Sequence, residues 1–293
     1  MPIHKVLIGG HWRESDSTGT FQAADPKAST PIPEDYPISS WNECAAALDA
    51  AVEAWEQLRT VPADQIARFL ECYAERMEAR SAEICDLASR ETALPVEPRL
   101  ASGELPRTTN QLRQAAAAAR SYSWCQPTID TATNIRSCFG SIGPVAVFGP
   151  NNFPMAFGSI SGGDFAAAIA AGNPVIAKAN SMHPGTTRLL AEESQAAADE
   201  TGMPPGTVQL IYRMSHEDGE RLAGDSRLAA IGYTGGRAAG LKLKAAADAA
   251  GKPIYLELSS VNPVVILPGA LEERGEEIAT ELTTSCLMGT GQF

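Results

Sequence analysis

Long stretches of the chain repeat apolar residues every three to four positions, the spacing of one buried face of an α-helix. In the first half this pattern predicts helices over residues 41–58, 66–77, 81–91 and 104–121. Five consecutive alanines in the last of these favour close helix packing, with a low-complexity linker as the alternative. The first 35 residues or so are short apolar pieces separated by Gly, Pro and Asp, which predict a small strand pair followed by a loop.

From residue 145 the pattern changes to short runs that are apolar throughout. These predict strands over residues 145–148, 174–178, 208–212, 228–233, 253–258 and 264–267. The segments between them predict helices over residues 158–171, 184–199, 237–250 and 271–287, with a short one starting at residue 216. Strands apolar on both faces that alternate with helices are typical of a covered parallel sheet. The expected fold class is therefore α/β, with a doubly wound, Rossmann-like parallel sheet.

Composition narrows the range of partners. The chain has 293 residues, with 23 Lys and Arg against 35 Asp and Glu, a net charge of −12. That balance argues against nucleic acid or an anionic membrane as the main partner, although a local basic pocket could still hold one phosphate. No apolar run approaches the roughly 20 residues of a membrane-spanning helix, and the N-terminus lacks the pattern of a signal peptide. The six cysteines form no CxxC pair and the four histidines no HxxxH, so we expect a cytoplasmic protein with free thiols and no bound metal.

Glycines follow one predicted strand, at the place where the carboxyl ends of a doubly wound sheet usually bind a ligand. The phosphate fingerprint GxGxxG is absent, but Thr234, Gly235, Gly236 and Gly240 connect a predicted strand to a predicted helix. Free backbone N–H groups at the first two glycines could hold a pyrophosphate. The alternative is an ordinary strand-to-helix turn.

Three other junctions carry side chains suited to chemistry. Asn152, in the sequence GPNNFP, has an amide that donates hydrogen bonds without titrating and suits a developing oxyanion; beside Pro, Asn is otherwise a common turn residue. Lys178 ends an apolar strand and could grip ribose hydroxyls or a phosphate, or simply extend into solvent. Glu257 lies within the apolar run IYLEL, where desolvation would tune it as a general base; the alternative is an exposed edge.

The order of these features resembles the NAD(P)-dependent aldehyde dehydrogenase superfamily. The shared motifs are PxNFP, a strand-ending Lys, TGG-xxx-G, and ELSS followed by Asn-Pro, spread from the IGGHW opening to the terminal GQF. Within the superfamily, the stretches GPNNFPMAFGSISGGDFAAAIAAGNPVIAKANSMHPGTT and LELSSVNPVVILPGAL most resemble the α-ketoglutaric semialdehyde (2,5-dioxopentanoate) dehydrogenases. Ser259 and Ser260, in place of the usual Gly-Gly, match that branch.

The resemblance implies a role for each of these residues. Asn152 would donate its amide to the oxyanion, Lys178 would contact the adenosine ribose, and Gly235–Gly240 would lie over the pyrophosphate. Glu257 would activate the water that hydrolyses a thioester, formed when a cysteine thiolate attacks the aldehyde and hydride passes to the nicotinamide. The implied reaction is NAD(P)-dependent oxidation of an aldehyde, 2,5-dioxopentanoate above all, to the carboxylate.

Residue types near Lys178 bear on the choice of cofactor. Many NAD-preferring relatives carry a Glu three residues after this Lys, whereas here the position is Ser181. A 2′-phosphate would then meet no carboxylate, and Lys178, helped by Arg213 at the end of the next strand, could pair with it. We therefore expect NADP+ to be accepted at least as well as NAD+.

The resemblance also implies a domain organisation. Residues 1–258 would form the cofactor-binding domain. Within it, residues 126–141, with their Thr, Ile and polar alternation, predict a protruding β-hairpin, which in the family bridges the subunits of a homo-oligomer. Residues 259–293 would begin the catalytic domain.

The nucleophile is the main departure from the family. Its cysteine directly follows the sequence GQ-x, which here is Gly291-Gln292-Phe293, so it is expected at the next position and residues 1–293 alone are expected to be inactive. The nearest thiol, Cys286, lies in an apolar helical stretch and is interpreted as a core residue. The competing hypothesis is a non-catalytic protein that binds a nucleotide or pairs with a related subunit. An acylating reductase is disfavoured because Glu257 is present to recruit water.

Overall fold

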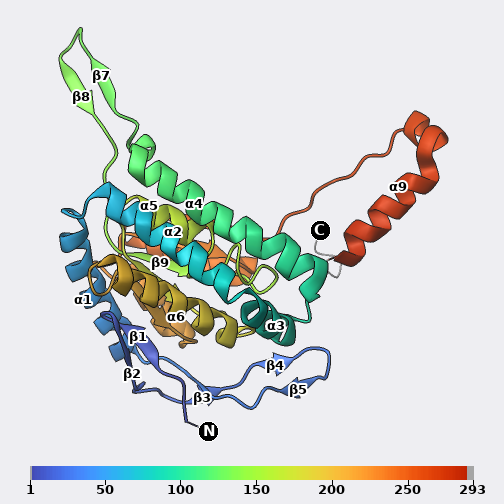
Figure 1. The fold of residues 1–293 in the computed structure, drawn as a ribbon, viewed down its shortest axis with the longest axis horizontal. Helices are drawn as coiled ribbons and strands as arrows, with labels where there is room; N and C mark the ends of the chain where they lie inside the picture. The colour runs from blue at the N-terminus through green and yellow to red at the C-terminus, as the bar shows by residue number, and fades with distance from the viewer. Residues whose placement is uncertain (1, 289–293) are drawn as a thin grey trace. The chain divides into compact units, whose positions relative to one another are not determined.

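A computed structural model describes residues 2–288 of the chain (Figure 1). The chain divides into two compact units, Met1–Leu258 and Ser259–Phe293. The helices of the first unit are α1 (Trp41–Leu58), α2 (Ala63–Ala79), α3 (Ser81–Thr92), the irregular segment η1 (Val96–Glu104), α4 (Leu105–Ser121), the single turn η2 (Ser123–Cys125), α5 (Gly163–Ala170), α6 (Pro184–Thr201), α7 (His216–Gly224) and α8 (Arg237–Ala249).

A seven-stranded sheet forms the centre of this unit, in the order β13-β12-β9-β10-β11-β1-β2. Its strands are β1 (Val6–Ile8), β2 (His11–Arg13), β9 (Val145–Phe148), β10 (Val175–Lys178), β11 (Val208–Ile211), β12 (Ala230–Thr234) and β13 (Ile254–Glu257). The five strands from β9 to β13 are parallel. The chain passes from β9 outward to β11 and then returns to the other side of β9 for β12 and β13, so the direction of winding reverses between β9 and β12. The predicted doubly wound α/β fold is confirmed.

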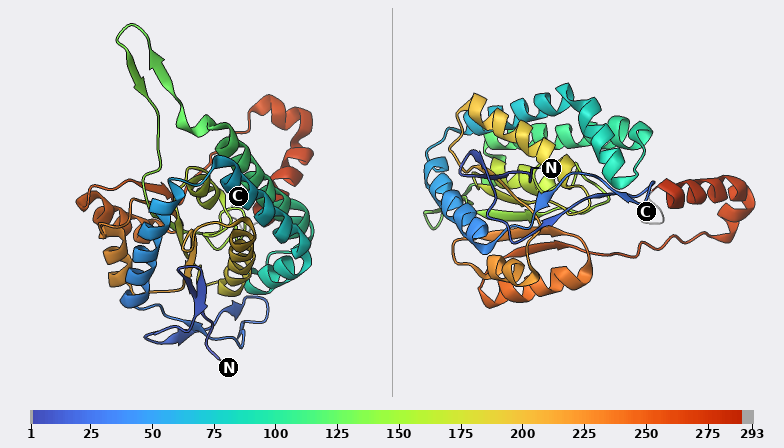
Figure 2. Two further views of the ribbon diagram at one scale, coloured as in Figure 1. Left: turned by 60° about the vertical axis from the view of Figure 1, so that its left-hand side comes forward. Right: turned by 90° about the horizontal axis from the view of Figure 1, so that it is seen from below.

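Helices cover the parallel part of the sheet on both faces (Figure 2). α2, α4, α5 and α6 pack together on one face, and α7 packs with α8 on the other. The first layer contributes fully buried aromatic side chains, such as Tyr73 and Phe165, whose ring centroids lie 5.9 Å apart in an edge-to-face pair. β9, β10 and β11 therefore lie within the core, as their largely apolar runs predict.

Local sequence explains where the helices begin and which face they bury. α1 opens on a capping box, in which the Ser40 hydroxyl accepts from the Glu43 N–H and the Glu43 carboxylate accepts from the Ser40 N–H. α2 presents one apolar stripe to the core at helical spacing: Ile66, Ala67, Phe69, Leu70, Tyr73, Ala74 and Met77. The helices predicted in the first half are confirmed, with ends that shift by up to three residues.

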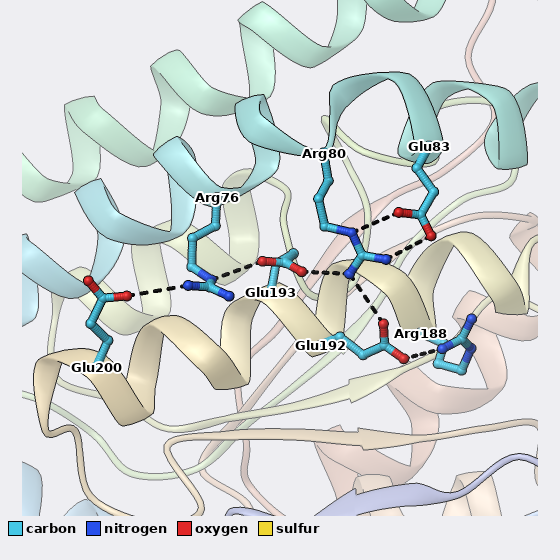
Figure 3. Close-up of polar contacts among 7 residues, drawn as sticks. All are labelled: Arg76, Arg80, Glu83, Arg188, Glu192, Glu193 and Glu200. Carbon is cyan, nitrogen blue, oxygen red and sulfur yellow. Dashed lines mark hydrogen bonds and ion pairs between the residues drawn. The ribbon is translucent and has the colours of Figure 1, made fainter.

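An ion-pair network ties α6 to α2 and α3 (Figure 3). Seven charged residues form it: Arg76, Arg80, Glu83, Arg188, Glu192, Glu193 and Glu200. At its centre the buried Glu193 carboxylate lies 2.9 Å from Arg76 Nε and 2.6 Å from Arg80 Nη1. Because a buried carboxylate is costly unless it is paired, both guanidinium groups are needed to offset its desolvation. The network fixes the helix that follows Lys178 and its strand.

The predicted hairpin at residues 126–141 is confirmed and differs from the rest of the unit in being exposed. Its strands, β7 (Thr128–Asp130) and β8 (Ile135–Ser137), pair antiparallel and project from the end of α4 (Figure 1). None of the helices in the described part of the chain is both long and apolar enough to cross a membrane.

Other expectations about individual elements are wrong. The helix predicted over 158–171 begins only at Gly163, because the preceding residues fold into close turns; a Cβ at Gly162 would lie 2.7 Å from the Phe157 backbone. The strand pair predicted for the N-terminal segment is confirmed as β1 and β2, but the expectation of a plain loop after it is wrong. β1 and β2 extend the sheet antiparallel, making it mixed, and two small ribbons follow: β3 (Thr20–Phe21) with β6 (Tyr36–Pro37), and β4 (Ala24–Asp25) with β5 (Thr30–Pro31).

The second unit holds one regular element among its described residues, α9 (Pro268–Met288), which is interrupted at Arg274. The strand predicted at 264–267 is absent. A strand needs a hydrogen-bonded neighbour, and the described chain gives this segment none. The expected start of a second α/β domain is therefore represented here by a helix without a strand.

Candidate functional site

The carboxyl ends of the parallel strands bring the predicted residues to one edge of the sheet. In the register of the sheet, Phe148 of β9 lies beside Lys178 of β10, and Thr234 of β12 lies beside Glu257 of β13. The loop with Asn152 follows β9 at the point where the winding reverses. Doubly wound sheets bind their ligands at such a point.

The loop after β9 is held in place by a buried ion pair that the sequence did not reveal. Arg99 Nη1 lies 2.6 Å from Glu104 Oε2, and Arg99 Nη2 donates to the Asn152 carbonyl at 3.0 Å. The other Glu104 oxygen accepts from the N–H groups of Met155 and Ala156 at 2.8 and 3.0 Å. These contacts fix the backbone on both sides of Asn152. Its side-chain amide has no hydrogen-bond partner within residues 2–288, so it can donate to a bound molecule.

The neighbouring junction, between β10 and α6, contacts the same loop. Gly149 is required there because a Cβ would lie 2.7 Å from the Ser159 nitrogen. The Asn180 amide donates to the Gly149 carbonyl at 3.0 Å, and His183 Nε2 donates to the Pro150 carbonyl at 2.9 Å. Burial lowers the pKa of His183 to about 4, so this histidine is neutral and acts as a structural donor.

Lys178 is an unneutralised cation at the carboxyl end of β10. Burial, and secondly the charge of Arg213, lower the pKa of its ammonium group to about 8. No acidic side chain in the described chain pairs with it. Ser181 lies three residues further on, half-buried, and Arg213 is exposed at the end of the neighbouring strand. A desolvated lysine beside a second cation, with a small neutral residue nearby, is suited to binding an anion.

The junction after β12 corrects one expectation about the glycines. The Gly235 N–H donates to the Glu257 carbonyl at 3.0 Å, so it is not free for a ligand. Gly236 precedes α8, whose first turn receives no hydrogen bond from a capping side chain, and this helix terminus can therefore bind an anion. Gly240 allows α8 to approach the sheet, because a Cβ there would lie 2.6 Å from Leu258 Cδ2.

The Glu257 side chain is exposed, as the alternative interpretation of its strand expected. β13 is an edge strand with one bare face, on which Tyr255 is 67% exposed and the Glu257 side chain is exposed as well. The expectation that Glu257 is desolvated is therefore wrong for the described chain. A second carboxylate lies close by. Burial, and secondly the charge of Glu257, raise the pKa of Asp164, whose carboxylate packs against Gly232 of β12.

The thiol considered in the second unit is also exposed. Cys286 lies in α9 with an exposed side chain, so its interpretation as a core residue is wrong. The reason is that α9 buries few residues of its own; Ile278 is its buried apolar side chain in the described range. Gly291, Gln292 and Phe293 lie outside the described residues.

Comparison with known proteins identifies relatives over nearly the whole chain. The sequence profile of the aldehyde dehydrogenase family matches residues 12–293. The chain is 38% identical to α-ketoglutaric semialdehyde dehydrogenase 2 of Azospirillum brasilense, over 99% of this chain and 57% of that protein. It is 37% identical to the α-ketoglutaric semialdehyde dehydrogenase of Acinetobacter baylyi, over 99% of this chain and 56% of that one. The chain thus spans little more than half the length of these relatives.

Solved structures share the fold. The aldehyde dehydrogenase of Bartonella henselae superposes with a TM-score of 0.83 at 22% identity, over 100% of this chain and 59% of that one. An aldehyde dehydrogenase of Pseudomonas syringae, solved with NAD+ and octanal, superposes with a TM-score of 0.80 at 22% identity, over 90% of this chain and 52% of that one.

Proposed function

Because this chain belongs to the aldehyde dehydrogenase family, we propose that it forms the cofactor-binding part of an enzyme that oxidises a semialdehyde to a carboxylate with NAD(P)+. The observation that carries this proposal is that Asn152, Lys178, the start of α8 and Glu257 all lie at the carboxyl ends of the parallel strands. The proposed substrate is 2,5-dioxopentanoate, which is α-ketoglutaric semialdehyde, after the names of the relatives.

The residues at the edge fit a dinucleotide. The unneutralised Lys178 suits a ribose hydroxyl or the 2′-phosphate of NADP+. The uncapped start of α8 suits the pyrophosphate. The cofactor, when bound, accepts the hydride that leaves the substrate. Ser181 and Arg213 support acceptance of NADP+ at least as well as NAD+, because neither repels a 2′-phosphate.

Asn152 and Glu257 then have separate roles in the reaction. Asn152 donates its amide N–H to the oxygen that becomes negatively charged when a nucleophile adds to the aldehyde. Glu257, whose exposed carboxylate is open to water, removes a proton from the water that hydrolyses the acyl intermediate. A cysteine thiolate is the nucleophile that the family resemblance implies. The position of this cysteine, directly after Phe293, stays a prediction. Sequencing the gene beyond the Phe293 codon tests it.

The decisive assay is NAD(P)H formation by the gene's full-length product. We expect turnover of 2,5-dioxopentanoate and release of 2-oxoglutarate, measured by absorbance of the reduced cofactor and by mass spectrometry of the product. A full-length product that binds the dinucleotide but oxidises neither this compound nor pentanal would contradict the proposal.

The exposed hairpin favours the second candidate, a subunit-interaction role. Ile129, Ile135 and Phe139, at 65%, 62% and 64% exposure, give it an apolar surface that a second subunit of a homo-oligomer would cover. This role is compatible with catalysis, and it becomes the alternative function if the reading frame stops after Phe293. Replacing Ile129 and Ile135 by serine should shift the oligomer toward monomer in size-exclusion chromatography.

A further inference from the structure

Two cysteines lie on the two chain segments that form the base of the exposed hairpin. Cys125 ends η2, just before β7, and Cys138 directly follows β8 (Figure 1). Both are free thiols, Cys125 partly buried and Cys138 exposed. The pair precedes β9 in the chain, whereas Asn152 follows that strand. The proposed oxidation of aldehydes therefore gives these two thiols no role.

Backbone contacts hold the two segments together on both sides of Cys138. Thr128 pairs with Ser137 in the register of the hairpin, and the Phe139 N–H donates to the Cys125 carbonyl at 2.8 Å. With standard bond lengths, the Cα atoms of the two cysteines then lie no more than about 8 Å apart. A disulfide spans Cα separations of roughly 4.4 to 6.8 Å. Because every residue of β7 and β8 is exposed, no core packing resists a movement into this range.

The charge of one thiolate acts on the other sulfur. Burial, and secondly the charge of Cys138, raise the pKa of the Cys125 thiol. Because salt and water screen exposed charges beyond about 10 Å, this influence supports a short separation between the two sulfurs. The raised pKa keeps Cys125 protonated, so the exposed Cys138 is the sulfur that an oxidant meets first.

The other thiols of the described chain have different surroundings. Cys44 and Cys85 are fully buried, and burial raises their pKa values to about 12 and about 11. Burial also raises the pKa of Cys72 to about 11. Thiols of this kind react slowly. Cys286 is exposed but belongs to the other compact unit, which makes it a matched control for reactivity.

We propose that Cys125 and Cys138 form a reversible disulfide that closes the base of the hairpin in the presence of a small-molecule disulfide such as oxidised glutathione. The Cys138 thiolate attacks one sulfur of that molecule and expels a thiolate. The Cys125 thiolate then attacks the Cys138 sulfur and expels the second. The two protein thiols are thereby oxidised, and the small disulfide is reduced to two thiols that take up the two protons. This inference does not depend on the proposed function.

The test is a disulfide map of the native full-length protein after incubation with oxidised glutathione and alkylation of the remaining thiols. Trypsin cleaves after Arg120, Arg136 and Lys178, so each cysteine falls in a peptide of its own. Mass spectrometry should find peptide 121–136 linked to peptide 137–178, and excess reduced glutathione should separate them. Absence of the linked peptides would overturn the proposal.

Single substitutions separate the two steps of the exchange. Cys125→Ser should stop the reaction after the first step and leave one glutathionyl group on Cys138. In Cys138→Ser, Cys125 should take up glutathione at least about tenfold more slowly than Cys138 does in Cys125→Ser, because its pKa is raised. Cys286→Ser should leave the linked peptides unchanged. A covalent dimer through Cys138 on a non-reducing gel, in place of the linked peptides, would contradict the pairing.

Hydrogen exchange measures whether the disulfide closes the hairpin. In the oxidised wild type, the amides of residues 128–137 should exchange about tenfold more slowly than in the reduced protein. The reason is that the cross-link removes conformations in which β7 and β8 separate. Cys125→Ser, treated with oxidised glutathione in the same way, should exchange at the rate of the reduced wild type. Equal exchange in the oxidised and the reduced wild type would refute the closing of the hairpin.

Discussion

β10 and β13 are four-residue apolar runs that each end in a charged residue, VIAK and IYLE, yet the sheet gives them different surroundings. β10 lies between two parallel neighbours, and its first three residues are buried. β13 pairs with β12 alone and exposes every second residue. Consequently Lys178 loses solvent and has its pKa lowered, whereas Glu257 remains exposed. The burial of a strand-ending residue is thus decided by the place of its strand in the sheet.

The two regions are proposed to act in different steps of the reaction. The β9–β10 region, with its supported loop and unneutralised lysine, is built within the described chain and is proposed to bind the cofactor and the oxyanion. The β12–β13 region presents Glu257 on an uncovered face, open to the water it is proposed to activate. Variants in each region should therefore impair separate steps.

The largest effect is expected at Asn152, in the β9–β10 region. Asn152→Ala in the full-length protein should lower kcat for aldehyde oxidation by about 10² to 10³, because a donor to the developing oxyanion is lost. The neighbouring Asn151, whose side chain is exposed, provides a matched control, and Asn151→Ala should change kcat by about twofold at most. Steady-state assays that find the two variants equally impaired would contradict the role of Asn152.

A smaller effect is expected from the cation of the same region. Lys178→Met should raise Kd for NADP+ about 10- to 100-fold, the loss expected for a contact between an ammonium group and a phosphate. Kd for NAD+ should rise much less. Lys242→Met, at an exposed position of α8, is the control. Fluorescence titration measures the Kd values for both cofactors. A wild type that prefers NAD+ by more than about tenfold, some 1.4 kcal/mol, would contradict the expectation that NADP+ is accepted at least as well.

The pH dependence of cofactor binding should show the smallest effect. With its pKa lowered to about 8, Lys178 is charged at pH 7 and mostly neutral at pH 9. Because the charged form binds the phosphate, Kd for NADP+ should rise about tenfold over this range and stay flat in Lys178→Met. An identical pH profile for the wild type and the variant would show that another group governs binding.

Sequence patterns were sufficient for the parts of the fold that repeat locally. Apolar runs alternating with helical segments predicted the parallel strands and the winding, and the junction residues Asn152, Lys178 and Glu257 do lie at the carboxyl ends of these strands. These predictions succeed because a buried parallel strand must be apolar on both faces.

The misses concern contacts between distant segments. Arg99 and Glu104 support the Asn152 loop from about fifty residues away in sequence, and no local pattern signals such a pair. The use of the Gly235 N–H by Glu257 depends on strand register, and the exposure of Glu257 depends on β13 lying at the edge. Both are properties of the assembled sheet that a single run of residues does not contain.

The division of labour between the two regions is tested most directly at Glu257, by rapid mixing of the full-length protein with cofactor and 2,5-dioxopentanoate. In Glu257→Gln, the first turnover should release a burst of reduced cofactor of wild-type amplitude and rate, while steady-state turnover falls by about 10² or more because water is no longer activated. Equal loss of the burst and of the steady state would contradict this account, since Glu257 would then act before hydrolysis or hold the fold.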